Sequence, residues 1–395
     1  MGASKRLLVW GVTLAILPLT LLACGGEDTT SAPPTPMADG TSAVADTPPF
    51  GIEVEFPKTD FSKHSVPYHE IISGGPPRDG IPAIHSPKFV SVREADGWLA
   101  SREAVVALEI GGDARAYPVQ ILIWHEIVND VVGGTPVAVT WCPLCNTAIV
   151  FRRELDGLVL DFGTTGRLRF SNLIMYDRQT ESWWQQASGE AIVGELTGKR
   201  LAMLPASLVS WQDYKTAYPS GRVLSRETGH GRPYGLNPYI AYDQGDPFLY
   251  QGPAIAGALP AMARVVTVDM GREAVAYPYD VLARVKVVND TVAGHPIVVF
   301  WRKGTASPLD VGAVGEGRDV GSAAVFSRLM DGRVLTFEAL GDKFRDRETG
   351  STWDLLGQAR GGPLAGRRLE PVTAINHFWF SWAAFRPDTR VYAPQ

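Results

Sequence analysis

A Cys-Pro-Leu-Cys turn is the most reactive stretch of the chain. Cys142 and Cys145 stand within TWCPLCNTAIVF, and the sequence has one other cysteine, Cys24. Two thiols at this spacing can form a reversible disulfide, offer two soft ligands to a metal ion, or close a small structural loop. We therefore expect the chemistry of this protein to centre on this pair.

A metal site needs further ligands, and His125 is the best candidate. We expect it at the end of a helix that leads into the strand carrying Cys142. Two thiolates and one imidazole suit copper or zinc by ligand type. Glu126 could be an additional ligand or an acid-base group, but we rank it below His125 because neighbouring helix residues point in different directions. Soft-metal binding by Cys142, Cys145 and His125 is the leading hypothesis.

The same cysteine pair also allows two other functions. In a thiol-disulfide redox protein, Cys142 would attack and Cys145 would resolve the mixed disulfide. A thioredoxin fold is not expected, because the residues after Cys145 alternate like a strand and supply no helix N-terminus to lower a thiol pKa. In a non-catalytic binding scaffold, the pair would be a structural disulfide, although so short a ring adds little stability. These alternatives stay open.

An internal duplication organises the elements that must position these residues. Residues 105–141 align without a gap with residues 265–301, an offset of 160 from Trp141 to Trp301, and both copies keep AYP, VND and the final Trp. Such self-similarity indicates repeated structural units. We expect two tandem related modules, residues 91–226 and 261–395, packed as one pseudo-symmetric body with a β-rich α+β fold.

The two copies differ where the candidate chemistry lies. His125, Glu126 and Cys142 of the first copy align with Val285, Lys286 and Arg302 of the second. The nine residues 142–150 of the first copy correspond to the 24 residues 302–325 of the second, which contain no cysteine. The joint change predicts a single site, carried by the first module only.

Local patterns predict the elements of the first module. EAVVALEI and TPVAVTW are typical of strands, and AIVFRRELDGLVLDFG of two strands joined by an Asp-Gly turn. Helices are expected in PVQILIWHEIVND, residues 118–130, and PASLVSWQDYKTAYP, residues 205–219. The polar cluster at Asp177 and Arg178, kept in the second copy, is expected to be a structural ion pair beside a core tryptophan.

The N-terminal residues predict export. Lys5 and Arg6 precede an apolar stretch, and the LLAC that follows resembles a bacterial lipobox, so residues 1–23 are expected to be a lipoprotein signal peptide and Cys24 the lipidation site. An uncleaved membrane anchor is the alternative. Residues 24–50 form the expected flexible tether, followed by an N-terminal extension, residues 51–90. The protein is thus expected outside the cytoplasm, held to a bacterial membrane by lipid on Cys24.

Composition excludes some partners. A net charge of -5 without a long basic run argues against nucleic-acid binding. The glycines lack the spacing of a nucleotide-binding loop, so no nucleotide cofactor is expected.

Residues 227–260, rich in Gly, Pro and Tyr, are expected to form an ordered strap between the modules with packed tyrosines. The lone histidines His230, His295 and His377 are expected on the surface or in the core. The sequence does not indicate a protein partner.

Several motifs together resemble a known family. WHEIVND, PVAVTWCPLCNTAIVF, DGLVLDFGTTG, MYDRQTESWWQQ and ETGHGRPYGLNPY, in this order, are similar to a bacterial and archaeal family called domain of unknown function 3179. The resemblance implies an exported or lipid-anchored protein whose family pattern includes His125, Cys142 and Cys145. It implies no reaction.

Overall fold

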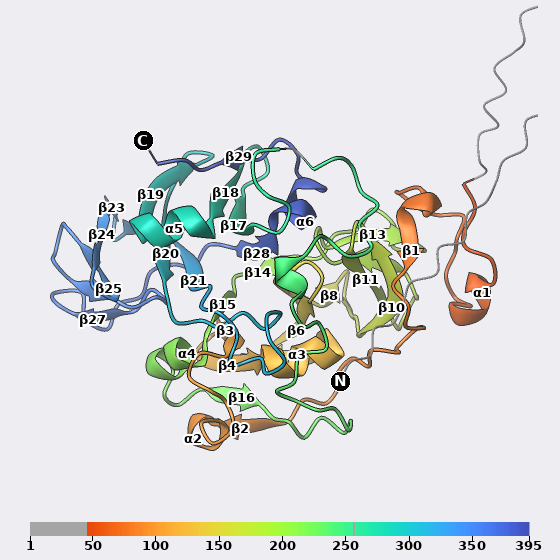
Figure 1. The fold of residues 1–395 in the computed structure, drawn as a ribbon, viewed down its shortest axis with the longest axis horizontal. Coiled ribbons are helices and arrows are strands. Elements are labelled where there is room, and N and C mark those ends of the chain that lie inside the picture. Colours follow the sequence, from red (N-terminus) through yellow and green to blue (C-terminus); the bar gives the residue numbers. More distant parts are fainter. Residues whose placement is uncertain (1–45, 256, 395) are drawn as a thin grey trace, which may run out of the picture. The chain divides into compact units, whose positions relative to one another are not determined.

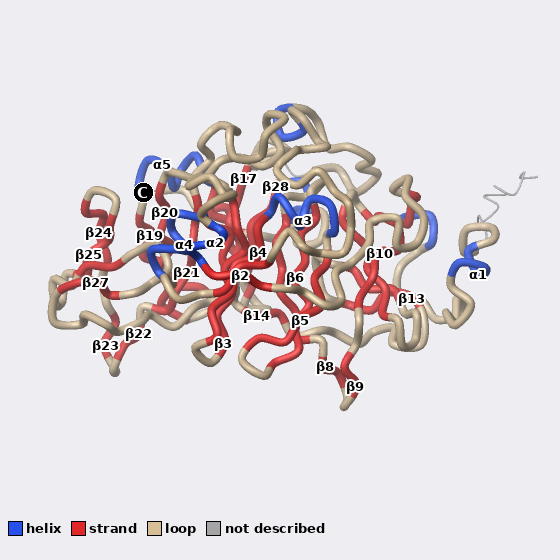
Figure 2. Tube along the Cα trace, turned by 90° about the horizontal axis from the view of Figure 1, so that it is seen from below, coloured by secondary structure: helices blue, strands red, loops and turns tan. Residues whose placement is uncertain are grey.

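The computed structural model describes residues 46–255 and 257–394. They belong to one compact unit. The predicted signal peptide, Cys24 and nearly all of the tether lie outside the described residues. Figure 2 shows that strands dominate and that the helices are short, which confirms the β-rich fold. No helix in the described part of the chain is long and apolar enough to cross a membrane.

Each module holds a sheet in which four corresponding strands occur in the same order, and the sheet of the first module has a fifth strand, β2, at its edge. In the first module the order is β15-β3-β4-β16-β2, and in the second it is β28-β17-β18-β29. The first sheet comprises β2 (Phe89–Ser91), β3 (Ala104–Ile110), β4 (Asp113–Pro118), β15 (Ser207–Ser210) and β16 (Arg222–Leu224). The second comprises β17 (Arg264–Asp269), β18 (Ala274–Pro278), β28 (Ala374–Phe378) and β29 (Arg390–Val391). Both include one parallel pair, β16 with β4 and β29 with β18.

A second pair of sheets carries the cysteine turn and its counterpart. The first is β14-β7-β6-β5, built from β5 (Ile127–Val132), β6 (Thr135–Cys142), β7 (Thr147–Arg152) and β14 (Met203–Leu204). The second is β19-β20-β21, built from β19 (Val287–Val292), β20 (His295–Arg302) and β21 (Ser322–Ser327). The corresponding strands therefore meet in the same order.

Each module also has a third sheet and a small hairpin. In the first module the third sheet has the order β1-β10-β11-β12-β13, with β1 (Ile71–Ser73) from the N-terminal extension, β10 (Phe162–Arg169), β11 (Asn172–Asp177), β12 (Trp183–Gln185) and β13 (Glu190–Val193). Its counterpart contains β24 (Phe337–Leu340), β25 (Lys343–Asp346), β26 (Thr352–Trp353) and β27 (Ala359–Gly361). Small hairpins precede them, β8 (Glu154–Leu155) with β9 (Leu158–Val159) and β22 (Leu329–Met330) with β23 (Arg333–Val334). The predicted Asp-Gly turn is confirmed, since Asp156 and Gly157 both have positive φ, 49° and 82°.

The helices are shorter than the sequence pattern predicted. They are α1 (Ile52–Glu55), α2 (Val92–Ala95), α3 (Val119–His125), α4 (Trp211–Ala217), α5 (Tyr279–Val285) and α6 (Trp379–Ala383), with 3-10 turns η1 (Tyr68–Glu70) and η2 (Tyr242–Gln244). The prediction of a helix over residues 118–130 was wrong beyond His125, because the β-branched residues that follow pair with β6 as strand β5. The prediction of a helix over residues 205–219 was wrong before Trp211, because Ser207–Ser210 pair with β3 as strand β15 and only Trp211–Ala217 form a helix, α4.

The motifs that the two copies share serve the fold. Tyr117 donates a hydrogen bond to Asp130 at 2.6 Å, and Tyr277 donates to Asp290 at 2.8 Å. These residues are the Tyr of AYP and the Asp of VND in each copy. The Asn of VND also acts alike in both modules, since its side chain bonds the backbone N–H and C=O of one phenylalanine, Phe162 or Phe337.

The polar cluster around Asp177 is a buried hydrogen-bond network. The Asp177 carboxylate accepts from the Thr180 backbone and from the Trp184 indole, at 2.6 and 2.9 Å. Asp346 makes the same bonds in the second module, to Thr349 and Trp353. The predicted core tryptophan is present, but the expected ion pair is not formed here, because Arg178 pairs with Asp79.

Removing the second of these carboxylates should destabilise the fold strongly. In Asp346→Ala the half-buried backbone N–H of Thr349 and the buried indole N–H of Trp353 lose their acceptor. We expect the free energy of unfolding to fall by about 3 kcal/mol. Urea denaturation measures the change. The exposed Asp342→Ala is the control and should change it by less than about 0.5 kcal/mol.

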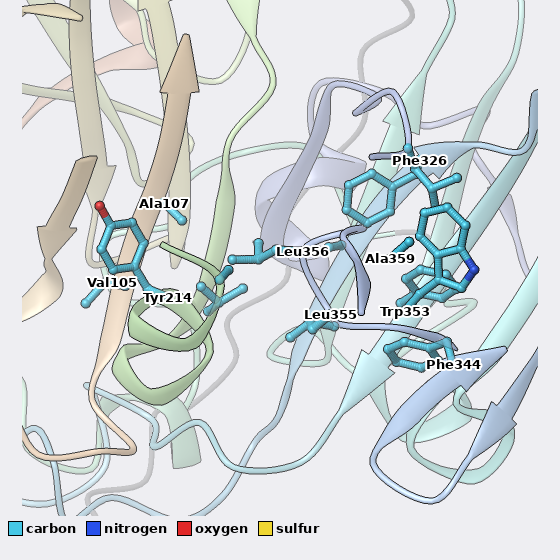
Figure 3. Packing of buried hydrophobic residues seen from close by; sticks show 14 of the residues in the cluster. Val105, Ala107, Tyr214, Phe326, Phe344, Trp353, Leu355, Leu356 and Ala359 are labelled. Atoms are coloured by element: carbon cyan, nitrogen blue, oxygen red, sulfur yellow. The ribbon is translucent and has the colours of Figure 1, made fainter. Parts of the chain in front are cut away.

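The modules share a hydrophobic core. One cluster combines Val105 and Tyr214 of the first module with Phe326 and Trp353 of the second, as Figure 3 shows. In Figure 1, the β24–β27 sheet of the second module lies at one side and the β10–β13 sheet of the first at the other. The shared cluster of buried side chains holds the two modules together between these outer sheets.

Candidate redox site

The cysteine turn lies between two paired strands. Cys142 is the last residue of β6 and pairs with Thr147, the first residue of β7. Cys145 lies in the turn, which Asn146 completes with a positive φ of 51°. Both cysteines are free thiols, buried, and their Sγ atoms are 2.8 Å apart. The structure thus brings together the two predicted thiols, and β7, not a helix, follows them, as expected.

A buried network of amide side chains surrounds the Cys145 sulfur. Asn172 donates from its Nδ2 atom to the Cys145 Sγ at 3.1 Å and to the Gln186 side-chain oxygen at 2.8 Å. Gln185 donates to the Asn172 oxygen at 2.6 Å, and Gln186 donates to the Thr140 hydroxyl at 2.9 Å. All of these side chains are buried. The network anchors the cysteine turn, and through Asn172 it gives the Cys145 sulfur a hydrogen-bond donor.

Sequence reasoning missed this network, although a signal was present. Thr140 aligns with Phe300, and Gln186 aligns with Leu355 when the copies are matched at Trp184 and Trp353. Phe300 and Leu355 belong to the hydrophobic core of the second module. Polar residues that replace core residues in one of two similar modules indicate a site, because burying them requires specific partners.

Glu126 is the acidic group of the site. Its side chain is buried, and with Cys142 it lines a cavity of about 90 Å³. Burial and the nearby Cys142 raise the pKa of Glu126 well above its ordinary value. No side chain or backbone group of the described residues donates a hydrogen bond to its carboxyl group. The carboxyl is therefore free to bond whatever enters the cavity.

The backbone of both modules turns sharply at this position. Glu126 has φ 57° and its counterpart Lys286 has φ 60°. The N–H of Glu126 donates to the Leu122 carbonyl, and the N–H of Lys286 donates to the Leu282 carbonyl. The C=O of Glu126 accepts from the Trp141 N–H, and that of Lys286 accepts from the Trp301 N–H. A positive φ is uncommon for residues other than glycine. The fold imposes the turn in both modules, and only the first uses it to present a carboxyl group.

His125 forms hydrogen bonds outside the cavity that Cys142 and Glu126 line. Its Nδ1 atom lies 2.7 Å from the Pro82 carbonyl, and its Nε2 lies 2.7 Å from the Tyr234 hydroxyl. Both ring nitrogens are thus occupied. Among the described residues, no three His, Cys, Asp or Glu side chains come close enough to hold a metal ion. Glu126, which the sequence ranked below His125, lines the cavity with Cys142, whereas His125 does not.

The connector forms the roof of the cavity. Tyr239 and Phe248 line it from above the thiol. Tyr242 donates to the Leu144 carbonyl at 2.8 Å, and Ser171 donates to the Phe248 carbonyl at 2.5 Å. The expectation of an ordered strap is confirmed for these residues. The hydroxyls of Tyr234 and Tyr250 also have partners.

The long loop of the second module holds this strap. Strap residues Asn237 and Ala241 donate backbone bonds to the loop carbonyls of Gly312 and Asp310, at 2.9 and 2.6 Å. Buried Asp243 of the strap pairs with Arg264 at 2.6 Å and Arg318 at 2.8 Å. The segment that replaces the cysteine turn in the second copy therefore helps to close the site of the first.

The second module also supports the cysteine turn directly. The Nδ1 atom of buried His377 lies 2.9 Å from the Thr147 hydroxyl, and Phe378 donates its N–H to the Cys145 carbonyl at 2.8 Å. Burial lowers the pKa of His377 to about 3. His377 is thus a core histidine, as expected, but it lies beside the site. His230 lies at the strap, 5.2 Å from His125 between ring centroids, and His295 is exposed.

One protein family matches this chain over most of its length. The family, described as a protein of unknown function (DUF3179), covers residues 78–389. The chain belongs to it. The DUF3179 match spans both modules and the connector, so the thiols, Glu126, the roof and the supporting loop all lie within it. The chain has no significant match among curated proteins or among solved structures.

Proposed function

We propose that Cys142 and Cys145 form a reversible dithiol-disulfide couple and that Glu126 carries the proton of Cys142. The distance between the sulfurs is the observation that supports this proposal most. At 2.8 Å they lie closer than two thiolates on a tetrahedral zinc ion, which are about 3.8 Å apart when each bond is about 2.3 Å. A disulfide bond of about 2.05 Å can form with a shift of less than about 1 Å.

The surroundings of Cys142 explain the need for Glu126. Burial raises the pKa of the Cys142 thiol well above its ordinary value, and the hydrogen bond to Cys145 raises it further. The backbone N–H groups of Leu173 and Cys145 lower it, but less. No cation is among these influences. Burial raises the pKa of Glu126 in the same direction as that of Cys142, so the deprotonated form of Glu126 is a base strong enough to accept the thiol proton as the sulfur attacks, which supports its role as proton carrier.

The couple exchanges two electrons and two protons. On oxidation, Cys142 attacks a two-electron oxidant and its proton passes to Glu126. Cys145 then attacks Cys142, forms the S–S bond and releases its own proton with the leaving group. On reduction the same groups act in reverse, and protonated Glu126 donates to the departing Cys142 sulfur. Cys142 is the attacking residue because it lines the cavity, whereas Cys145 lies behind it.

Equilibration with redox buffers of dithiothreitol and of 2-mercaptoethanol, which together cover potentials on both sides of about -300 mV, tests the couple. After the thiol content stops changing, alkylation and mass spectrometry count free thiols per chain. We expect a single two-electron transition at a potential above about -300 mV, the range of exchangeable disulfides. It should be absent in Cys145→Ser. A pair that stays fully reduced or fully oxidised over the whole range would contradict the proposal.

Soft-metal binding by the same thiols is the alternative to this proposal, and metal analysis distinguishes the two. The described residues offer two thiols and no third His, Cys, Asp or Glu ligand close enough to complete a metal site. We therefore expect anaerobically purified protein to contain much less than one copper or zinc per chain, with no change in Cys142→Ser. Stoichiometric metal that is lost in that variant would replace the redox proposal by metal binding.

A further inference from the structure

We infer that the oxidant of this couple is a small hydroperoxide that enters the cavity above Cys142. The inference rests on the proposed dithiol-disulfide function and names its substrate class. Three observations carry it: the size of the cavity, the hydrogen bonds that hold the strap lining it, and the unpaired carboxyl group of Glu126.

The cavity admits only a small molecule. Its volume is about 90 Å³, whereas a protein cavity that binds benzene has a volume of about 150 Å³. Cys142 is 1% exposed and Cys145 is 0% exposed. A disulfide carried by a protein, or by a tripeptide such as glutathione, would have to reach the sulfur through this space. The size of the cavity therefore favours an oxidant of a few heavy atoms.

The roof is fastened on both sides. Tyr242 and Ser171 tie the strap to the first module, next to the cysteine turn and at the start of β11. Asp243 ties the strap to the second module through its buried pair with Arg264. Opening the site to a large partner would break these bonds together, whereas a small molecule requires no opening of this kind.

The lining of the cavity suits an uncharged peroxide. Its walls are mainly apolar, with contributions from Leu144, Leu168, Leu173 and Phe248. The one cation among the lining residues, Arg167, has its charge balanced by Glu55 at 3.3 Å, although its buried Nε atom has no hydrogen-bond partner among the described residues. The Glu126 carboxyl, which has no hydrogen-bond partner in the described structure, can bond a peroxide oxygen beside the thiol.

The reaction balances with these groups alone. The Cys142 sulfur attacks the terminal oxygen of ROOH, the S–O bond forms and the O–O bond breaks, giving a sulfenic acid and ROH. The proton of the Cys142 thiol ends on ROH, relayed by Glu126. Cys145 then attacks the Cys142 sulfur, so the S–S bond forms and water leaves with the Cys145 proton. Two electrons pass from the dithiol to the peroxide.

Comparison of oxidants by size tests the inference. Reduced protein is mixed with hydrogen peroxide, cumene hydroperoxide or glutathione disulfide, and thiol loss is followed by quenched alkylation. Each rate is divided by the rate for the same chain unfolded in urea, which removes differences in intrinsic reactivity. We expect this ratio for hydrogen peroxide to exceed the other two by at least tenfold.

Two variants on the strap give a matched comparison. Phe248 lines the cavity and is 57% exposed, whereas Ile240 is 64% exposed and does not line it. Phe248→Ala should raise the ratio for cumene hydroperoxide about tenfold with little effect on hydrogen peroxide. Ile240→Ala should change neither ratio. Equal ratios for all oxidants in the parent protein, or equal effects of both variants, would overturn the inference.

The outcomes separate this inference from the proposed function. If the redox buffers reveal the couple but hydrogen peroxide forms no Cys142–Cys145 disulfide in the folded protein, the substrate class is wrong and the couple stands. If no reagent forms that disulfide reversibly, both proposals fall.

Discussion

Replacing Glu126 by Gln is expected to slow oxidation of the dithiol, and reduction of the disulfide, by about 100-fold or more. Gln keeps the size of the side chain but cannot accept or donate the proton of Cys142. Stopped-flow measurement of thiol loss with hydrogen peroxide, and of disulfide reduction with dithiothreitol, gives both rates. The equilibrium potential should move by less than about 30 mV, because the carboxyl group acts on the rate in both directions alike.

The second module supplies the matched control. Lys286 occupies the same left-handed backbone position as Glu126, with φ 60° against 57°. Lys286→Gln therefore tests the effect of glutamine on this turn without touching the thiols, and should leave both rates unchanged. A Glu126→Gln protein that reacts as fast as the parent would remove Glu126 from the proposed function. A slow variant with a shifted unfolding midpoint would assign the effect to the turn.

Mild acid is expected to destabilise the folded chain through its two buried histidines. Burial lowers the pKa of His125 to about 4 and that of His377 to about 3, from an unfolded value near 6.5. Above pH 6.5 both states are neutral at these residues. As the pH falls below 6.5, each histidine is protonated in the unfolded chain but stays neutral in the folded chain. The free energy of unfolding therefore falls until the pH reaches the pKa of that histidine in the folded chain. The loss approaches about 3 kcal/mol for His125 and about 5 kcal/mol for His377.

Single variants isolate each histidine from the other titrating groups. Buried Glu126 and Glu103 act with the opposite sign, because their raised pKa values let the folded chain bind protons first. We therefore compare the pH slope of the unfolding free energy between pH 6.5 and 4. It should flatten in His125→Gln and in His377→Asn relative to the parent, even though both variants start less stable. An unchanged slope in either variant would show that its histidine is protonated in the folded state.

Much of the architecture could be predicted from the sequence. The duplication predicted modules of related structure, and the strand orders of the sheets match between them. The Asp-Gly hairpin and the strand after Cys145 were also local properties, set by turn chemistry and β-branched residues. The helix ends were less predictable, since residues 127–130 become a strand only by pairing with β6.

The composition of the site depended on tertiary structure. The sequence by itself determined that the reactive thiols lie close together and in one module. Cys142 and Cys145 are separated by only two residues, and the second copy contains no cysteine. Only the fold decided that Glu126 and not His125 shares the cavity with Cys142. Helix α3 ends between the two residues and the backbone reverses at Glu126, so adjacent side chains diverge. A strap distant in the sequence and a loop of the other module then close the space above the thiols and bury the carboxyl group.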